Sequence, residues 1–116
     1  MKRALLVLAL VACKQKAAPP PHEEPVQVLP AAEIQRSSDA CKAYEQKVCD
    51  CAQTVEAAKQ PCGLAHALPD AVKLSLEIAA NPETSKSDAL RAQQHVRETA
   101  KECIEQTAKL AQLGCP

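Results

Sequence analysis

Six cysteines after residue 38 are the residues of this chain whose type and number most clearly predict chemistry. An even number of cysteines in a small exported chain is typical of a disulfide framework. Three bridges would also compensate for a core that contains no Phe and no Trp. As free thiolates, the same side chains could instead bind a soft metal ion or exchange disulfides. The six candidates are Cys41, Cys49, Cys51, Cys62, Cys103 and Cys115.

The sequence Cys49-Asp50-Cys51 is the part of this set most open to a metal or redox interpretation. On a regular helix, however, residues two apart point about 200° from each other, so these two sulfurs cannot share one ion. The spacing also differs from the Cys-x2–4-Cys pairs of zinc sites. We therefore expect structural disulfides, with no metal and no cofactor. The alternative is a metal-handling or thiol-redox role for Cys49, Cys51 and Cys62, with His66 or His95 as a further ligand.

The element that carries the first cysteines is a predicted helix. Ser37-Ser38-Asp39 offers an N-cap, and the residues up to about Lys59 are rich in Ala, Glu, Gln and Lys, which are good helix formers. Gln60-Pro61-Cys62-Gly63 is expected to end this helix. Apolar side chains recur at three- and four-residue steps and predict one buried stripe, made of Cys41, Tyr44, Val48, Cys51, Ala52 and Val55.

Two more helices are predicted further along the chain. The second runs from near Pro69 to Ala80, because proline is tolerated in a first turn. The third is capped by Ser85 or Ser87 and continues to about Leu113, with Gly114 as its C-terminal cap. No apolar pattern of period two occurs, so we expect an all-α, three-helix domain. The buried face of the third helix is predicted to hold Val96, Ala100, Cys103, Thr107 and Leu110.

Helix geometry restricts which cysteines can pair. Cys41 and Cys49 lie about 12 Å apart along one helix, beyond the roughly 7 Å that a disulfide allows between Cα atoms. If the first and third helices are antiparallel, the residue numbers of the two cysteines in a bridge should add up to nearly the same value for every bridge between these helices. The pairs Cys41–Cys115 and Cys49–Cys103 meet this condition, with sums of 156 and 152. They leave Cys51–Cys62, and this is the set that we favour.

A parallel arrangement remains open as the alternative. In that arrangement, the difference between the residue numbers of the two bonded cysteines should be nearly the same for each bridge. The pairs Cys49–Cys103 and Cys62–Cys115 meet this condition, with differences of 54 and 53. That set leaves Cys41 with Cys51 on one helix.

The N-terminal residues form a different unit. Lys2 and Arg3 precede an apolar run over residues 4–12, which fits a secretory h-region and is shorter than the roughly 20 residues of a membrane span. The run ends in Leu10-Val11-Ala12-Cys13, which resembles the bacterial lipobox. This resemblance implies cleavage before Cys13, with diacylglycerol on its sulfur and a third acyl chain on the new amine. Two or more chains anchor a protein stably. In such lipoproteins, an Asp directly after the lipidated cysteine implies retention in the inner membrane. This chain has Lys14 at that position, which implies location in the outer membrane.

The chain therefore divides into three predicted parts. Residues 1–12 are a lipoprotein signal peptide, residues 13–38 are the lipidated Cys13 and a Pro-rich disordered tether, and residues 39–116 are the disulfide-linked domain. The tether prediction depends on prolines, which fix φ and remove hydrogen-bond donors. They are Pro19, Pro20, Pro21, Pro25 and Pro30.

Composition argues against several functions. Lys plus Arg equals Asp plus Glu at 14 each, so no strongly basic surface would recruit nucleic acid. Two glycines leave little room for a phosphate-binding loop, and neither Gly-x-Ser-x-Gly nor His-Glu-x-x-His occurs. We expect no catalytic residues and no enzyme activity.

By resemblance, the chain belongs with the uncharacterised small Cys-rich lipoproteins of the bacterial cell envelope. Its expected partners are the membrane, through the anchor at Cys13, and an envelope protein. The helical domain would then be an interaction or structural module.

Overall fold

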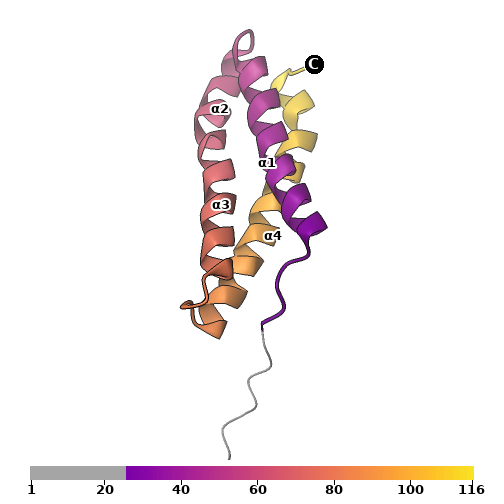
Figure 1. Cartoon of the computed structure of the whole chain (residues 1–116). Coiled ribbons are helices and arrows are strands. Elements are labelled where there is room, and N and C mark those ends of the chain that lie inside the picture. The colour runs from indigo at the N-terminus through magenta and orange to yellow at the C-terminus, as the bar shows by residue number, and fades with distance from the viewer. Residues whose placement is uncertain (1–25) are drawn as a thin grey trace, which may run out of the picture.

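A computed structural model describes residues 26–116, and this part of the chain is helical (Figure 1). The helices are α1 (Ala31–Ala52), α2 (Lys59–Ala65), α3 (Ala67–Ala80) and α4 (Lys86–Ala108), with 3-10 turns η1 (Glu56–Ala58) and η2 (Leu110–Leu113). No strand occurs between residues 26 and 116, so the prediction of an all-α domain is confirmed. The predicted signal peptide, the lipidation site at Cys13 and the tether up to Pro25 lie outside the described residues.

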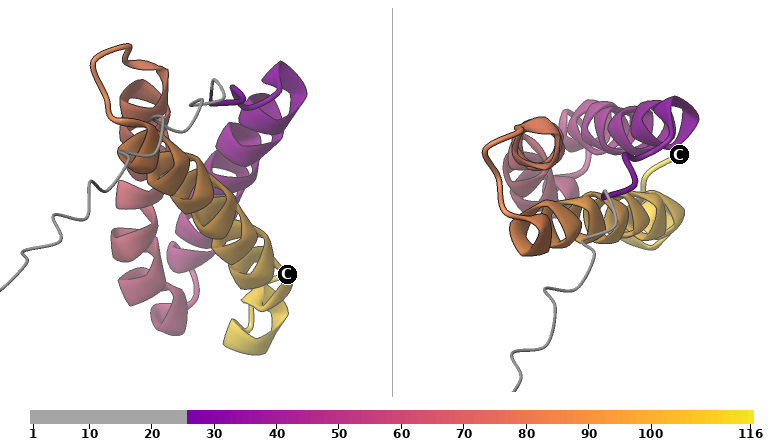
Figure 2. Two further views of the ribbon diagram at one scale, coloured as in Figure 1. Left: turned by 90° about the horizontal axis from the view of Figure 1, so that it is seen from below. Right: turned by 60° about the horizontal axis from the view of Figure 1, so that its bottom comes forward.

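The helices form three rods that run up, down and up (Figure 1). Only His66 separates α2 from α3, and the two helices continue in nearly the same direction as one rod. Each rod packs against the other two (Figure 2). The predicted three-helix domain is therefore confirmed. Because two links each reverse the direction of the chain, α1 and α4 are parallel.

The domain begins earlier than predicted. Helix α1 starts at Ala31, and the carbonyl oxygen of Pro30 accepts hydrogen bonds from the backbone N–H groups of Glu33 and Ile34. Leu29 is buried in the core. The tether boundary at residue 38 is therefore wrong. Pro30 opens the helix rather than excluding it, because a proline preceding the first turn loses no helical hydrogen bond.

The link after α1 also differs from the prediction. Helix α1 ends at Ala52 rather than near Lys59, and Pro61 lies within the first turn of α2 instead of terminating α1. That turn needs no backbone donor from Pro61, so the proline is compatible with the helix. The second predicted helix, expected to start near Pro69, starts at Ala67 and follows α2 directly.

The ends of α4 largely follow the prediction. The backbone N–H of Asp88 donates to Ser85 Oγ, and the Ser85 hydroxyl donates to the Asp88 carboxylate, which closes a reciprocal cap. Helix α4 ends at Ala108, earlier than the predicted Leu113, and η2 continues the chain. Gly114 then adopts the left-handed conformation, with φ of 91°, as a C-terminal cap.

The core contains small side chains and cysteines. The predicted stripes of α1 and α4 are buried, apart from Ala52, Val55 and Thr107, which are half-buried. Burial, with a contribution from the Glu102 carboxylate, raises the pKa of Tyr44. Within residues 26–116, every buried side-chain polar atom has a hydrogen-bond partner. The buried stripe residues are Cys41, Tyr44, Val48, Cys51, Val96, Ala100, Cys103 and Leu110.

All six cysteines of the domain are bridged, but not in the favoured pairs. The disulfides are Cys41–Cys103, Cys49–Cys62 and Cys51–Cys115. The favoured set of Cys41–Cys115, Cys49–Cys103 and Cys51–Cys62 is wrong because it assumed an antiparallel first and third helix. Parallel helices require constant differences, and the two long-range bridges have sequence separations of 62 and 64.

The parallel alternative is also wrong, although its helix direction is correct. It paired Cys103 with Cys49, whereas Cys103 is bonded to Cys41, eight residues earlier on α1. The alternative therefore shifts α4 by about two helical turns along α1. It also joined Cys62 to Cys115, whereas Cys62 lies on the descending helix α2 and is bonded to Cys49.

Candidate functional site

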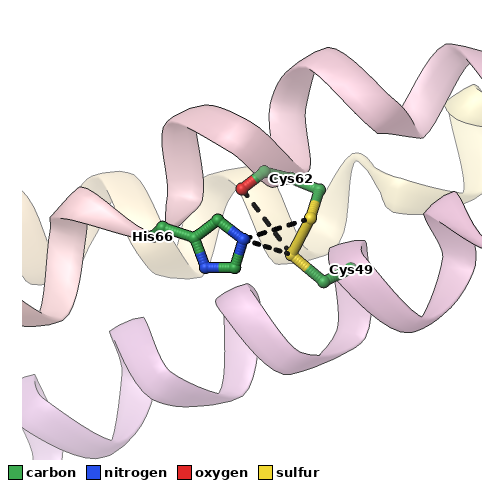
Figure 3. A group of neighbouring side chains, drawn as sticks. All are labelled: Cys49, Cys62 and His66. Carbon is green, nitrogen blue, oxygen red and sulfur yellow. Dashed lines mark hydrogen bonds between the residues drawn. A yellow bond between two sulfur atoms is a disulfide. The ribbon is translucent and has the colours of Figure 1, made fainter.

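The Cys49–Cys62 disulfide and the imidazole of His66 form a cluster between α1 and α2 (Figure 3). The Nε2 atom of His66 lies 3.8 Å from Cys49 Sγ and 3.7 Å from Cys62 Sγ, so it faces both sulfurs. These three atoms all lie within 4.8 Å of one another. The cluster therefore brings together two sulfur atoms and one nitrogen atom, which are the ligand types of soft and borderline metal ions.

Four-residue spacing on two facing helices builds this cluster. Glu45 and Cys49 are four residues apart on α1, and Cys62 and His66 have the same spacing at α2. Residues at this spacing lie on the same helix face. The disulfide joins the two faces and leaves His66 opposite Glu45.

Glu45 fixes the orientation and the tautomer of His66. Its Oε1 atom lies 2.6 Å from His66 Nδ1. A carboxylate only accepts hydrogen bonds, so Nδ1 carries the proton. In the neutral ring, Nε2 then carries the free lone pair, and this is the atom that faces the sulfurs. A carboxylate that orients a histidine in this way is the usual outer-shell partner of a metal-ligating imidazole.

The Cys49–Cys62 bridge is the most accessible of the three disulfides. Both of its cysteines are half-buried, and His66 is exposed. In contrast, Cys41 and Cys103 have 0% exposure, and Cys51 and Cys115 have 6% and 8%. A reductant can therefore reach Cys49–Cys62 without opening the core.

The structure separates the residues of the predicted metal or redox set. It joins Cys49, Cys62 and His66, but Cys51 is bonded to Cys115 on another side of α1. The prediction that Cys49 and Cys51 cannot share one ion agrees with this arrangement. His95 lies on α4, where its Nδ1 atom is 3.0 Å from Ser75 Oγ.

Glu45 was not identified from the sequence. Its residue type is common on exposed helix faces, so composition gave no reason to select it. The usable signal is the repeated spacing, Glu45 four residues before Cys49 and Cys62 four residues before His66. That signal has meaning only when Cys49 and Cys62 are known to be bonded.

A second polar contact joins the start of α1 to α4. Arg97 Nε donates to Glu33 Oε1 at 2.6 Å, and Arg97 Nη2 lies 3.4 Å from Oε2. The hydrogen bond from Arg97 is the main reason that the pKa of Glu33 is lowered, and the same contact raises the pKa of Arg97. Nearby, the Gln93 side chain donates to the carbonyl oxygen of Gln27 at 2.8 Å. These contacts hold the entering chain against α4 and have no evident chemical role.

Among residues 26–116, no helix combines the length and the apolar character required to cross a bilayer.

Comparisons of the chain with protein-family models, with curated proteins and with solved structures found no match.

Proposed function

We propose that this chain is a small Cys-rich lipoprotein of the bacterial cell envelope, anchored through acyl chains on Cys13. The observation that carries the proposal is the sequence Leu10-Val11-Ala12-Cys13 directly after a basic residue pair and a short apolar run. The domain is a non-enzymatic interaction or structural module.

The disulfide framework supports export. Three bridges join all six cysteines that follow Cys13. Disulfides persist in oxidising compartments and are rare in the cytosol. This complete pairing therefore fits a domain that functions outside the cytosol. The small apolar core fits the same interpretation, because such cores need covalent cross-links.

The described part of the chain enters the bundle at one end. Its first residues lie near the end where α3 connects to α4 (Figure 1). The link between α1 and α2 lies at the opposite end of the bundle.

Metabolic labelling with a palmitate analogue tests the anchor. We expect label on the wild-type chain and its recovery in the outer-membrane fraction, whereas Cys13→Ser abolishes the label. The matched variant Lys14→Asp keeps the label and shifts the protein towards the inner membrane. An unlabelled wild-type chain, or a label that persists in Cys13→Ser, contradicts the proposal.

An exposed arginine offers a test of the interaction role. The Arg91 side chain is 78% exposed, whereas Arg97 is held by Glu33, so charge reversal at Arg91 changes the surface without breaking the contact to α1. An envelope partner that co-purifies from detergent-solubilised membranes should be lost with Arg91→Glu and retained with Lys73→Glu on α3. Retention with both variants would exclude the surface around Arg91 from the interface.

A further inference from the structure

We propose that two-electron reduction of the Cys49–Cys62 disulfide uncovers a metal site for a thiophilic divalent cation of the zinc class. Its ligands are Cys49 Sγ, Cys62 Sγ and His66 Nε2, and Glu45 is the positioning residue that holds the imidazole. The inference is independent of the lipid anchor, because it depends only on residues at the α1–α2 end of the bundle.

The two nitrogen–sulfur distances of the cluster are already close to those of a tetrahedral zinc site. Zinc–sulfur and zinc–nitrogen bonds of about 2.3 and 2.0 Å place a ligand sulfur and nitrogen roughly 3.6 Å apart. In the structure His66 Nε2 lies 3.8 and 3.7 Å from the two sulfurs. Once the disulfide is cleaved, side-chain rotation can separate the two thiolates to the roughly 3.8 Å that the same tetrahedral geometry requires. A fourth position stays open to water.

The positioning of His66 is the second observation that points to a ligand. Its Nδ1 proton is engaged by Glu45 Oε1 at 2.6 Å, which leaves the Nε2 lone pair directed at the sulfurs. This is the tautomer and orientation that metal binding needs.

The chemistry balances with a dithiol as the reductant. The dithiol transfers two electrons and two protons to the Cys49–Cys62 bond and becomes a disulfide, while Cys49 and Cys62 become thiols. The cation then displaces the two thiol protons to solvent and binds both thiolates and the imidazole. Reoxidation of the two cysteines by a disulfide-containing oxidant of the same class releases the cation, so the site is present only in the reduced state.

The remaining bridges preserve the fold during this step. Cys41–Cys103 and Cys51–Cys115 are buried and join α1 to α4 and to the C-terminus. The Cys49–Cys62 bridge closes a loop with a sequence separation of only 13, between helices that also pack directly on each other. Mild reduction should therefore open the accessible bridge and leave the bundle intact.

The test uses the purified full chain carrying Cys13→Ser, so that no seventh thiol competes. The chain is treated briefly with dithiothreitol, desalted without oxygen and titrated with Co²⁺. We expect the thiolate-to-cobalt charge-transfer absorption with one equivalent of Co²⁺ bound, and its loss when Zn²⁺ is added. The oxidised chain should show no such absorption. Alkylation and peptide mass analysis should find the free thiols at Cys49 and Cys62.

Matched variants separate the proposed ligands from general effects. His66→Ala should weaken Co²⁺ binding at least 10-fold, and Glu45→Gln should weaken it about 10- to 100-fold through the lost outer-shell contact. His95→Ala, which changes a histidine outside the cluster, should leave binding unchanged. Circular dichroism of each reduced variant reports helix content.

Three results would overturn the proposal. One is a reduced chain with free Cys49 and Cys62 that shows no thiolate–cobalt absorption. Another is equal Co²⁺ affinity in His66→Ala and His95→Ala. The third is mild reduction that opens a buried bridge first or abolishes the helical signal.

Discussion

Cys41 and Cys103 are bonded between two parallel helices, with their Cα atoms 5.0 Å apart. The bond joins the middle of α1 to the C-terminal half of α4, and Cys51–Cys115 extends the same register towards the C-terminus. Two long-range bridges with nearly equal sequence separations fix both the direction and the offset of these helices. The third bridge, Cys49–Cys62, holds the returning helix α2 against α1.

Non-reducing peptide mapping tests this connectivity directly. After free thiols are blocked at acidic pH, trypsin should release residues 37–42 linked to residues 102–109, which reports Cys41–Cys103. Residues 48–59, 60–73 and 110–116 should be recovered as one linked set. Cleavage before Asp50 then separates Cys49 from Cys51 and should assign Cys62 to the former and Cys115 to the latter. Residues 37–42 linked to 110–116 would instead indicate antiparallel α1 and α4.

The bridges should contribute unequally to stability. In the chain-entropy account, a bridge with a sequence separation of 62 contributes about 4 kcal/mol and one with a separation of 13 about 3 kcal/mol. We therefore expect Cys41→Ala/Cys103→Ala to lower the free energy of unfolding more than Cys49→Ala/Cys62→Ala. Burial increases the difference, because Cys41 and Cys103 are fully enclosed and their truncation leaves a cavity. Urea denaturation measures both losses. A larger loss for the accessible pair would contradict this account.

The helical pattern was predictable because it depends on local chemistry. Apolar spacing identified the buried stripe around Val48 and Val96, and Ser85 and Gly114 marked the ends of the last helix and its terminal turn. The predicted disulfide pairing was wrong, because pairing depends on the relative direction of two helices that are distant in the chain. Short links between three rods force the first and third to be parallel, and applying this constraint would have excluded the favoured set.

The candidate site shows the same limit. The sequence offers His66 as a ligand, but the partners of His66 depend on which cysteines are bonded. Glu45 acquires a role only when α2 folds back along α1 and places His66 opposite it. Long-range packing, rather than the residue types, decides this arrangement.

The two glycines should respond oppositely to alanine. Gly114 has a φ of 91°, a conformation that costs an L-residue about 1–2 kcal/mol, so Gly114→Ala should destabilise the domain by roughly that amount. Gly63 is helical, and a Cβ there meets nothing within 4 Å. Gly63→Ala should therefore stabilise the domain by about 0.5–1 kcal/mol. Thermal unfolding of the two variants compares them, and the same sign for both changes would exclude this explanation.

The contact between Glu33 and Arg97 should make the stability of the domain depend on pH in the acidic range. Because the pKa of Glu33 is lowered in the folded chain, its contribution is fully present above the unfolded pKa near 4.5 and is lost as pH falls through the lowered value. The contact is partly exposed, so the effect should be small. Glu33→Gln should reduce the Tm slightly at pH 7 and by a smaller amount at pH 3, where more of Glu33 is protonated. Glu77→Gln, an exposed control on α3, should have little effect at either pH. An equal loss at both pH values for Glu33→Gln would show that charge is not involved.

The intact mass of the native protein tests the central claim most directly. The protein is extracted from membranes in detergent without reductant and measured with and without thiol alkylation. We predict a chain cleaved before Cys13, carrying three acyl chains and lacking the six hydrogens of three disulfides, with no alkylated thiol. A mass that retains residues 1–12, or one without acyl chains, would contradict the account of an anchored, disulfide-linked domain.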